Sequence, residues 1–233
     1  MTSRIPQELA RAIDYTEVRK GLTYADVERV CLEAREHRVA ALVVPSALVR
    51  RAAAGLADTD VAVSCYVGYP FGTQAPGVKA REAEAAAEHG ASEIALVPHY
   101  GAVRAARWTD LETELATVRR AAEAAAYGIV VEASFLSDEE LARVASLAAD
   151  AGYVRIANTA GFRIVSTRPE TEPAATQEIV ARLSRAGDGR IRPKAVGGIG
   201  TRADAVRLLE AGAARVGVDA APGLLRRWAR EGN

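Results

Sequence analysis

The sequence has few of the residues that build metal centres or disulfide frameworks. Its two cysteines, Cys31 and Cys65, lie far apart and lack the spacing of metal ligands, which disfavours both a disulfide framework and a structural zinc site. Its three histidines, His37, His89 and His99, share no motif, so a histidine-rich metal centre is also disfavoured. We therefore expect neither a metal nor a cofactor.

The chain also lacks an excess of charge of either sign. Thirty Lys and Arg balance thirty Asp and Glu among 233 residues, so the formal net charge at pH 7 is zero. Nucleic-acid binders usually carry a basic excess, so we expect no nucleic-acid partner. No apolar run approaches the roughly 18 residues that span a bilayer, and residues 1–6 lack the apolar core of a signal peptide. We expect no membrane partner and, as the default, a cytoplasmic location.

The sequence does contain short β-branched runs that alternate with stretches rich in Ala, Glu and Arg. The runs are nearly continuous in apolar residues, which is typical of parallel strands covered by helices. We predict seven strands and an eighth at residues 13–18. The seven are residues 39–44, 61–67, 93–97, 129–133, 154–158, 192–196 and 215–218.

The stretches between the predicted strands carry helix signals. Thr23, Ser137 and Thr201 each stand before an acidic first turn, as N-capping residues do. Several helices are predicted to end in a glycine followed directly by a strand, because glycine adopts the left-handed conformation at little steric cost. These glycines are Gly90, Gly128, Gly152 and Gly212.

Eight strand–helix units in a chain of this length predict an α/β protein of the (β/α)8 TIM-barrel type, as one domain over residues 1–233. The rival is an open doubly wound sheet, which usually shows a glycine-rich nucleotide loop after a strand. Residues 43–46 show no such loop. The one long irregular segment, residues 163–173, is either a functional lid or a solvated connector.

Seven motifs then follow one another along the chain. They are residues 13–16, 67–72, 78–83, 90–94, 136–140, 158–162 and 194–201. In this order they resemble the deoxyribose-phosphate aldolases, which are class I aldolases on a (β/α)8 barrel. The resemblance runs from about Ile13 to Gly217, nearly the whole chain.

The resemblance implies a lysine near the end of the sixth strand that forms a Schiff base with the aldehyde donor. Placed without gaps on residues 156–162, that lysine position falls on Ala157, which has no amine and cannot form an imine. Arg155 faces the same way, but its guanidinium stays protonated and is a poor nucleophile. The catalytic aspartate that the resemblance implies on the fourth strand falls on Ala95, whereas the second family lysine matches Lys194.

Other polar positions implied by the resemblance are changed as well. On the second strand, the asparagine or cysteine positions are Leu42 and Val44. Gly197 and Gly198 of the phosphate-binding turns remain, but Asp219 stands where the family places a phosphate contact. Like charges a few ångströms apart repel by ~1–4 kcal/mol. We therefore expect a substrate without a phosphate group.

Only three lysines could supply an amine. Lys20 is expected in a solvated loop, and Lys79 in a structural salt bridge ahead of a helix. Lys194 lies at a strand end, on the face where barrel enzymes place their chemistry. Its amine either forms an imine, polarises a carbonyl, or is a residual charge paired with Glu132 or Asp219. Without a neighbouring lysine its pKa would fall only through burial, which weakens the nucleophile interpretation.

Glu132 and His99 are the other catalytic candidates. Glu132 lies near the end of an otherwise apolar fifth strand, where it either pairs with Lys194 or Arg155 or acts as a general acid or base. His99 follows the fourth strand, where it either moves protons near neutral pH or is an ordinary surface histidine.

Further residues are expected to contact the substrate. Tyrosines can wall a pocket or donate a proton, Asp14 faces the barrel mouth or anchors the first strand, and a glycine-rich turn offers amides to an anion or oxyanion. The expected contacts are Asp14, Tyr66, Tyr100, Arg155, Asn158, Gly197, Gly198 and Asp219.

These observations leave three hypotheses. The first is an aldolase-like enzyme that has lost the family lysine and aspartate and performs lyase, cyclase or dehydratase chemistry through an enol or enolate. Its substrate would be a small, unphosphorylated carbonyl compound in a specialised biosynthetic pathway, by analogy with the fold, and its catalytic residues Lys194, Glu132 and His99. The second is a non-catalytic binding protein, and the third is residual aldolase activity through Lys194. Family members are often dimers, so a homodimer fits the resemblance.

Overall fold

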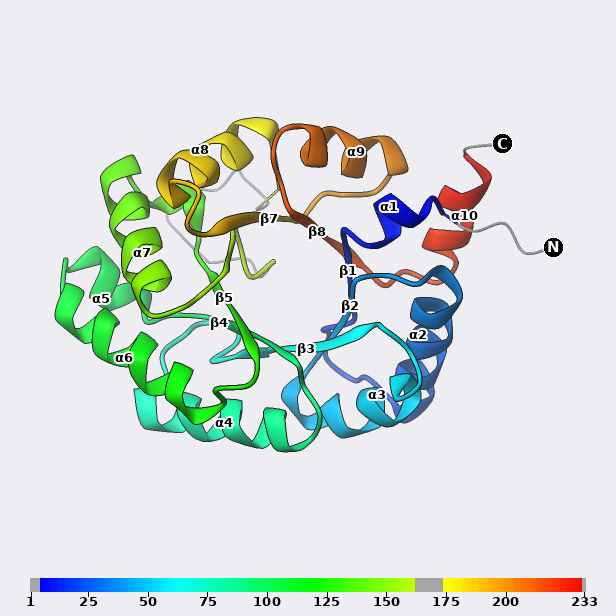
Figure 1. The fold of residues 1–233 in the computed structure, drawn as a ribbon, viewed down its shortest axis with the longest axis horizontal. Helices are drawn as coiled ribbons and strands as arrows, with labels where there is room; N and C mark the ends of the chain where they lie inside the picture. The colour runs from blue at the N-terminus through cyan, green and yellow to red at the C-terminus, as the bar shows by residue number, and fades with distance from the viewer. Residues whose placement is uncertain (1–4, 162–173, 232–233) are drawn as a thin grey trace.

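Eight parallel strands close into a barrel with helices around it (Figure 1). The structure is a computed structural model, and it describes residues 5–161 and 174–231. The strands follow one another around the barrel in chain order, and β8 pairs with β1. The predicted (β/α)8 fold is confirmed. The segment at residues 163–173, predicted to be a lid or a connector, lies outside the described residues.

All eight predicted strands are present, most of them a residue or two shorter than expected. They are β1 (Ile13–Thr16), β2 (Ala41–Val44), β3 (Ala62–Val67), β4 (Glu93–Leu96), β5 (Ala126–Val130), β6 (Arg155–Ala157), β7 (Arg192–Val196) and β8 (Arg215–Asp219).

The fifth strand differs from the prediction because Gly128 does not end a helix. Gly128 lies in the middle of β5. The strand begins at Ala126, three residues before the predicted start at residue 129. The alanine-rich run before it fits a helix or a buried strand equally well, so composition alone misplaced the boundary. Gly128 pairs with Arg155, and a Cβ there would lie 3.5 Å from the Arg155 Cβ. A side chain at position 128 would thus be in ordinary van der Waals contact with Arg155.

The helices between the strands begin where the capping signals predict. Thr23, Ser137 and Thr201 each form a reciprocal capping box with the acidic residue three positions later. The helices are α1 (Gln7–Ala10), α2 (Tyr24–His37), α3 (Val49–Leu56), α4 (Pro76–Glu88), α5 (Tyr100–Arg104), α6 (Trp108–Ala121), α7 (Asp138–Asp150), α8 (Gln177–Gly187), α9 (Arg202–Glu210) and α10 (Leu224–Arg230). Two short 3-10 helices, η1 (Ser46–Leu48) and η2 (Ala133–Phe135), follow β2 and β5.

The apolar core has two parts. The larger part lies between the strands and the surrounding helices, and the strand residues Leu42 and Val44 belong to it. The smaller part, which we call the inner apolar cluster, lies inside the barrel toward the carboxyl ends of the strands. It consists of Val43, Tyr66, Val97, Val130, Ala157, Ala160 and Val196. Because side chains alternate along a strand, Leu42 and Val44 face the helices while Val43 faces the barrel axis.

None of the helices within residues 5–161 and 174–231 has both the length and the apolar character needed to cross a bilayer. Across the same residues, no three His, Cys, Asp or Glu side chains gather closely enough to hold a metal ion.

Candidate active site

Charged side chains fill the barrel interior on the side of the inner apolar cluster that is nearer the amino ends of the strands. Asp14 of β1 accepts a hydrogen bond from Lys194 Nζ at 2.6 Å and another from Arg215 at 2.6 Å. Glu93 of β4 pairs with Arg155 at 2.8 Å and with Arg215 at 3.5 Å. We call these five residues the barrel ion network.

The barrel ion network corrects one expectation and adds two residues. The partner of Lys194 is Asp14, and not Glu132 or Asp219. The side chains of Lys194 on β7 and Asp14 on β1 both point toward the barrel axis and meet at the same level along it. Glu93 and Arg215 were not singled out from the sequence. Glu93 is the one charge of β4, and Arg215 begins β8 before three apolar or small residues; a charge in such a short strand is the signal that could have revealed them.

Lys194 is held as an ammonium ion. Its side chain is 7% exposed, and Gly217 on β8 leaves space for it, since a Cβ there would come within 3.4 Å of Lys194 Cε. Burial lowers the pKa of Lys194, but the Asp14 carboxylate more than offsets this, and the pKa lies above its ordinary value. The same pairing keeps the pKa of Asp14 below its ordinary value in spite of burial. A protonated amine bound in this way cannot attack a carbonyl.

The other two lysines lie elsewhere, and all three fall within the described residues. Lys20 is exposed on the loop after β1. Lys79 is fully buried outside the barrel, where its ammonium pairs with Glu114 and donates to the Gly72 carbonyl at 2.6 Å. The predicted structural salt bridge of Lys79 is thus confirmed. No second lysine amine reaches the end of β6.

A small cavity lies inside the barrel beside Lys194. Its volume is about 20 Å³, which suits roughly one water molecule. Ala157 and Ala95, the positions on which the resemblance places the imine-forming lysine and the aspartate, both line it, together with Tyr66 and Asp14. Two small side chains therefore leave open space next to the ammonium of Lys194.

Glu132 follows β5 and is 2% exposed. Its two oxygens accept hydrogen bonds from the Thr159 hydroxyl at 2.8 Å and from the Ala160 N–H at 3.0 Å. Neither Lys194 nor Arg155 pairs with it, so the alternative in which Glu132 forms an ion pair is wrong; both cations are held by carboxylates of the barrel ion network. Burial raises the pKa of Glu132, and the two hydrogen bonds offset only part of that effect.

Three tyrosines lie at the carboxyl ends of the strands, here called the mouth of the barrel. Tyr66 is 4% exposed and stacks on Tyr69, with ring centroids 5.1 Å apart. Tyr100 donates to the Val130 carbonyl at 2.8 Å. Burial raises the pKa of Tyr66, the Lys194 ammonium lowers it, and nearby carboxylates raise it again, with a net increase. Tyr66 is therefore a neutral hydrogen-bond donor at physiological pH.

The remaining expected contacts have different surroundings. Asn158 exchanges two hydrogen bonds with the backbone of Val196, so its amide is engaged in joining β6 to β7. Gly197 and Gly198 have φ angles of 95° and 70°, which favour glycine. Asp219 ends β8 and is exposed.

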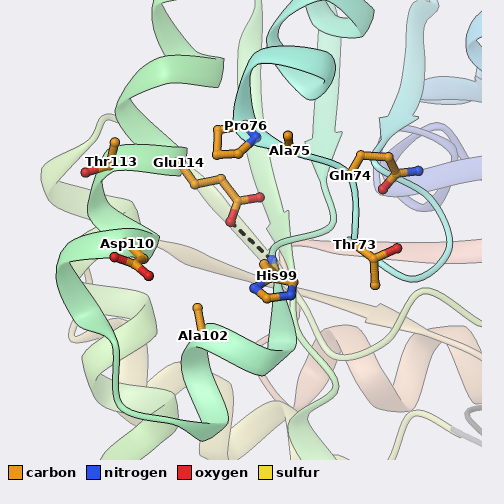
Figure 2. Close-up of a pocket in the computed structure, with 9 residues that line it drawn as sticks. All are labelled: Thr73, Gln74, Ala75, Pro76, His99, Ala102, Asp110, Thr113 and Glu114. Atoms are coloured by element: carbon orange, nitrogen blue, oxygen red, sulfur yellow. Dashed lines mark hydrogen bonds between the residues drawn. The ribbon is translucent and has the colours of Figure 1, made fainter.

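His99 lies apart from Lys194 and Glu132. Its side chain is exposed and lines a groove of about 400 Å³ outside the inner apolar cluster. Figure 2 shows its ring between the loop that carries Thr73 and helix α6, and its backbone N–H donates to Glu114 at 3.1 Å. The structure thus buries two of the three predicted catalytic residues, Lys194 and Glu132, with separate partners, and places His99 on another surface.

A closed (β/α)8 barrel with ionisable side chains at the carboxyl ends of its strands is the architecture of the barrel enzymes. Comparison with known proteins narrows this class. The chain belongs to the deoxyribose-phosphate aldolase family.

The relatives match over almost their whole length. A deoxyribose-phosphate aldolase from Carboxydothermus hydrogenoformans is 32% identical over 223 residues, covering 94% of each chain. One from Deinococcus radiodurans is 34% identical over 217 residues, covering 93% of this chain and 95% of its own. The solved structure of an aldolase designated QR15 superposes with a TM-score of 0.84 at 28% identity, covering 96% and 95%. No protein-family model matches the chain.

Proposed function

We propose that this chain is an enzyme that acts on a small, unphosphorylated carbonyl compound through an enol or enolate, without an imine. Lyase, cyclase and dehydratase reactions all share that intermediate. The observation that carries the proposal is the buried pair of ionisable groups with different roles: a Lys194 ammonium fixed by Asp14, and a Glu132 carboxyl that has no cationic partner among the described residues.

Lys194 is suited to stabilise negative charge on oxygen. An ammonium has three N–H donors, and the Asp14 contact at 2.6 Å uses one of them. The others remain for a carbonyl oxygen in the space beside Ala157. A preorganised donor in a site lined by apolar side chains stabilises a developing enolate strongly, because little water is there to screen it.

Glu132 is suited to move the proton on carbon. A general base works best when its pKa lies near the working pH, and burial shifts the pKa of Glu132 upward from its ordinary value. In the proposed step the Glu132 carboxylate takes the α-proton, the electron pair moves onto the carbonyl oxygen, and the Lys194 ammonium compensates that charge. The enolate then regains a proton, expels a β-substituent together with its bonding electrons, or attacks an aldehyde carbon to form a carbon–carbon bond; carbon–carbon cleavage is the reverse of that attack.

The test is exchange of α-protons for deuterium in D2O, followed by NMR on unphosphorylated aldehydes and ketones of three to six carbons. We expect exchange with the unchanged chain. Glu132→Gln should slow it by about 10²-fold or more, and Lys194→Met by about 10²–10³-fold. The matched controls are Glu112→Gln and Lys20→Met, which change the same residue types at exposed positions.

Borohydride reduction in the presence of acetaldehyde separates this proposal from residual aldolase activity. We expect no adduct on Lys194, since its amine is protonated and bound to Asp14. An adduct on Lys194, together with rapid cleavage of deoxyribose 5-phosphate, would establish imine chemistry instead.

A non-catalytic binding protein is the second candidate. It is favoured by one observation: Lys194, in the middle of β7, and Arg155, the first residue of β6, are both already engaged by carboxylates. This candidate predicts no exchange with any carbonyl compound, and equal ligand binding by the unchanged chain and by Glu132→Gln.

A further inference from the structure

Asp219 is a charged side chain at the mouth that no described residue neutralises. It is the last residue of β8, and it has the same parity along the strand as Arg215, whose side chain contacts Asp14 inside the barrel. Asp219 therefore faces the mouth. Its carboxylate makes no hydrogen bond or ion pair with residues 5–161 or 174–231, and its side chain is exposed.

The aromatic pair Tyr66–Tyr69 lies within the electric field of Asp219. Burial raises the pKa of Tyr69 to about 12, and the charges of Tyr66, Asp219 and Glu132 contribute to that increase. The two rings stack at 5.1 Å with an interplanar angle of 27°. Electron-rich tyrosine faces beside a carboxylate form a setting that attracts a cation, through ring and charge together.

The cations below this mouth lie deeper in the barrel and are bound to carboxylates. Lys194 pairs with Asp14, and Arg215 pairs with Asp14 and Glu93. Glu132, the second carboxyl at the mouth, likewise has no cationic partner in the described part of the chain. A ligand that brings its own positive charge would therefore be attracted to this mouth, whereas a phosphate would be repelled by Asp219.

The hydroxyl of Tyr66 is an independent sign of a ligand. Tyr66 is 4% exposed, and its hydroxyl makes no hydrogen bond with a described residue. Tyr66 lines the small cavity with Lys194 and Ala157, so its hydroxyl is available to a ligand there. A carbonyl oxygen placed there would accept from both Tyr66 and Lys194.

We propose that the substrate is an amino aldehyde or amino ketone, whose ammonium group pairs with Asp219 against the Tyr66–Tyr69 rings while its carbonyl faces Lys194. The carbonyl half of this statement rests on the function proposed above. The ammonium half rests on Asp219 and the aromatic pair. The site would then recognise a positive charge in place of the phosphate of a sugar phosphate.

The experiment measures binding and exchange with three ketones of the same carbon chain. Aminoacetone carries an ammonium, hydroxyacetone is neutral, and hydroxyacetone phosphate is anionic. Calorimetric titration of the full chain at pH 6.5 should show aminoacetone binding about tenfold more tightly than hydroxyacetone, and the phosphate more weakly than both. Asp219→Asn should remove the preference for aminoacetone over hydroxyacetone.

The matched control is Asp60→Asn, which removes the same charge at an exposed position on the loop before β3, at the opposite end of the barrel. It should leave all three affinities unchanged. Equal affinity for aminoacetone and hydroxyacetone, tighter binding of the phosphate, or no effect of Asp219→Asn would each overturn the inference. Failure of all three ketones to bind at millimolar concentration would also overturn it.

Exchange separates this inference from the proposed function. If hydroxyacetone exchanges its α-protons but aminoacetone has no advantage, the ammonium site is wrong and the function stands. If aminoacetone binds through Asp219 but neither ketone exchanges, the ammonium site stands and the proposed catalysis is wrong.

Discussion

At the scale of single residues, the chemistry of this barrel depends on one contact, the ion pair between Lys194 and Asp14. Burial alone would lower the pKa of Lys194 and expose a neutral amine. The carboxylate reverses that effect and keeps the group charged. A lysine that could serve as a nucleophile is thereby held as a fixed positive charge.

Asp14→Asn should convert Lys194 into a nucleophile. Without the carboxylate, burial and the neighbouring Arg215 both favour the neutral amine, so its pKa should fall. Borohydride in the presence of acetaldehyde at pH 9 should then give an adduct that peptide mapping assigns to Lys194, whereas the unchanged chain gives none.

The same change should cost stability, because it leaves Lys194 without its counter-charge and Arg215 with Glu93 as its remaining partner. Removing one partner from a buried ion pair costs about 3–5 kcal/mol. Circular dichroism and a urea titration show whether the variant is folded at the pH of the trapping reaction. A folded Asp14→Asn variant without an adduct would contradict our account of Lys194.

Ala157→Lys combined with Ala95→Asp should introduce imine chemistry. Ala157 lies beside Lys194 in register, and both alanines line the same small cavity. A new amine beside an existing ammonium has its pKa lowered by repulsion and becomes nucleophilic at neutral pH. Mass spectrometry after reduction with acetaldehyde should find an adduct on residue 157. The single change Ala95→Asp, which adds no amine, is the control.

At the scale of elements, the helices are fixed largely by local signals. Three capping boxes begin α2, α7 and α9, each with its two reciprocal hydrogen bonds. Glycines with φ angles of 104°, 84° and 106° at Gly90, Gly152 and Gly212 form the turns that lead from helices into strands, as the sequence predicts. These signals act over three or four residues, which is why they can be read without the fold.

Ser137→Ala should destabilise the barrel by about 1 kcal/mol, because the Glu140 N–H at the start of α7 loses its acceptor at 3.1 Å. The free energy of unfolding in urea measures the loss. Ser146→Ala, inside the same helix, is the control and should not destabilise, since alanine favours a helix interior. Equal effects of the two changes would contradict the capping role.

At the scale of the whole molecule, the barrel interior changes along its axis from charged side chains to apolar ones. The barrel ion network lies toward the amino ends of the strands, and the inner apolar cluster lies toward the carboxyl ends. Lys194 lies where the barrel ion network meets the inner apolar cluster.

A homodimer and a cytoplasmic location stay predictions, as does the assignment of the chain to one domain.

The stability of the whole barrel should depend on pH through Glu132. The folded pKa of Glu132 is raised above its ordinary value of 4.5, so the folded state holds this proton more tightly than the unfolded state. Its contribution to stability is therefore fully present below pH 4.5 and is lost as the pH rises through the raised folded pKa.

Glu132→Gln removes this dependence. Relative to the unchanged chain, the variant should gain in free energy of unfolding as the pH rises from 4.5 to 8, because only the unchanged chain must then bury a charged carboxylate. Urea titrations at several pH values measure the difference. Glu112→Gln, at an exposed position, should follow the unchanged chain throughout, and parallel curves for Glu132→Gln would disprove the effect.

The sequence by itself determined the barrel and most helix starts, because apolar runs and capping act locally and the motifs keep their order along the chain. It also singled out Lys194 through the family resemblance and Glu132 as a charge in an apolar strand. It could not pair them. Whether Lys194 contacts Asp14, Glu132 or Asp219 depends on the depth at which strands from opposite sides of the barrel present their side chains, and only the closed barrel fixes that depth. The same closure separated His99 from the interior and placed Tyr66 beside the cavity at Ala157.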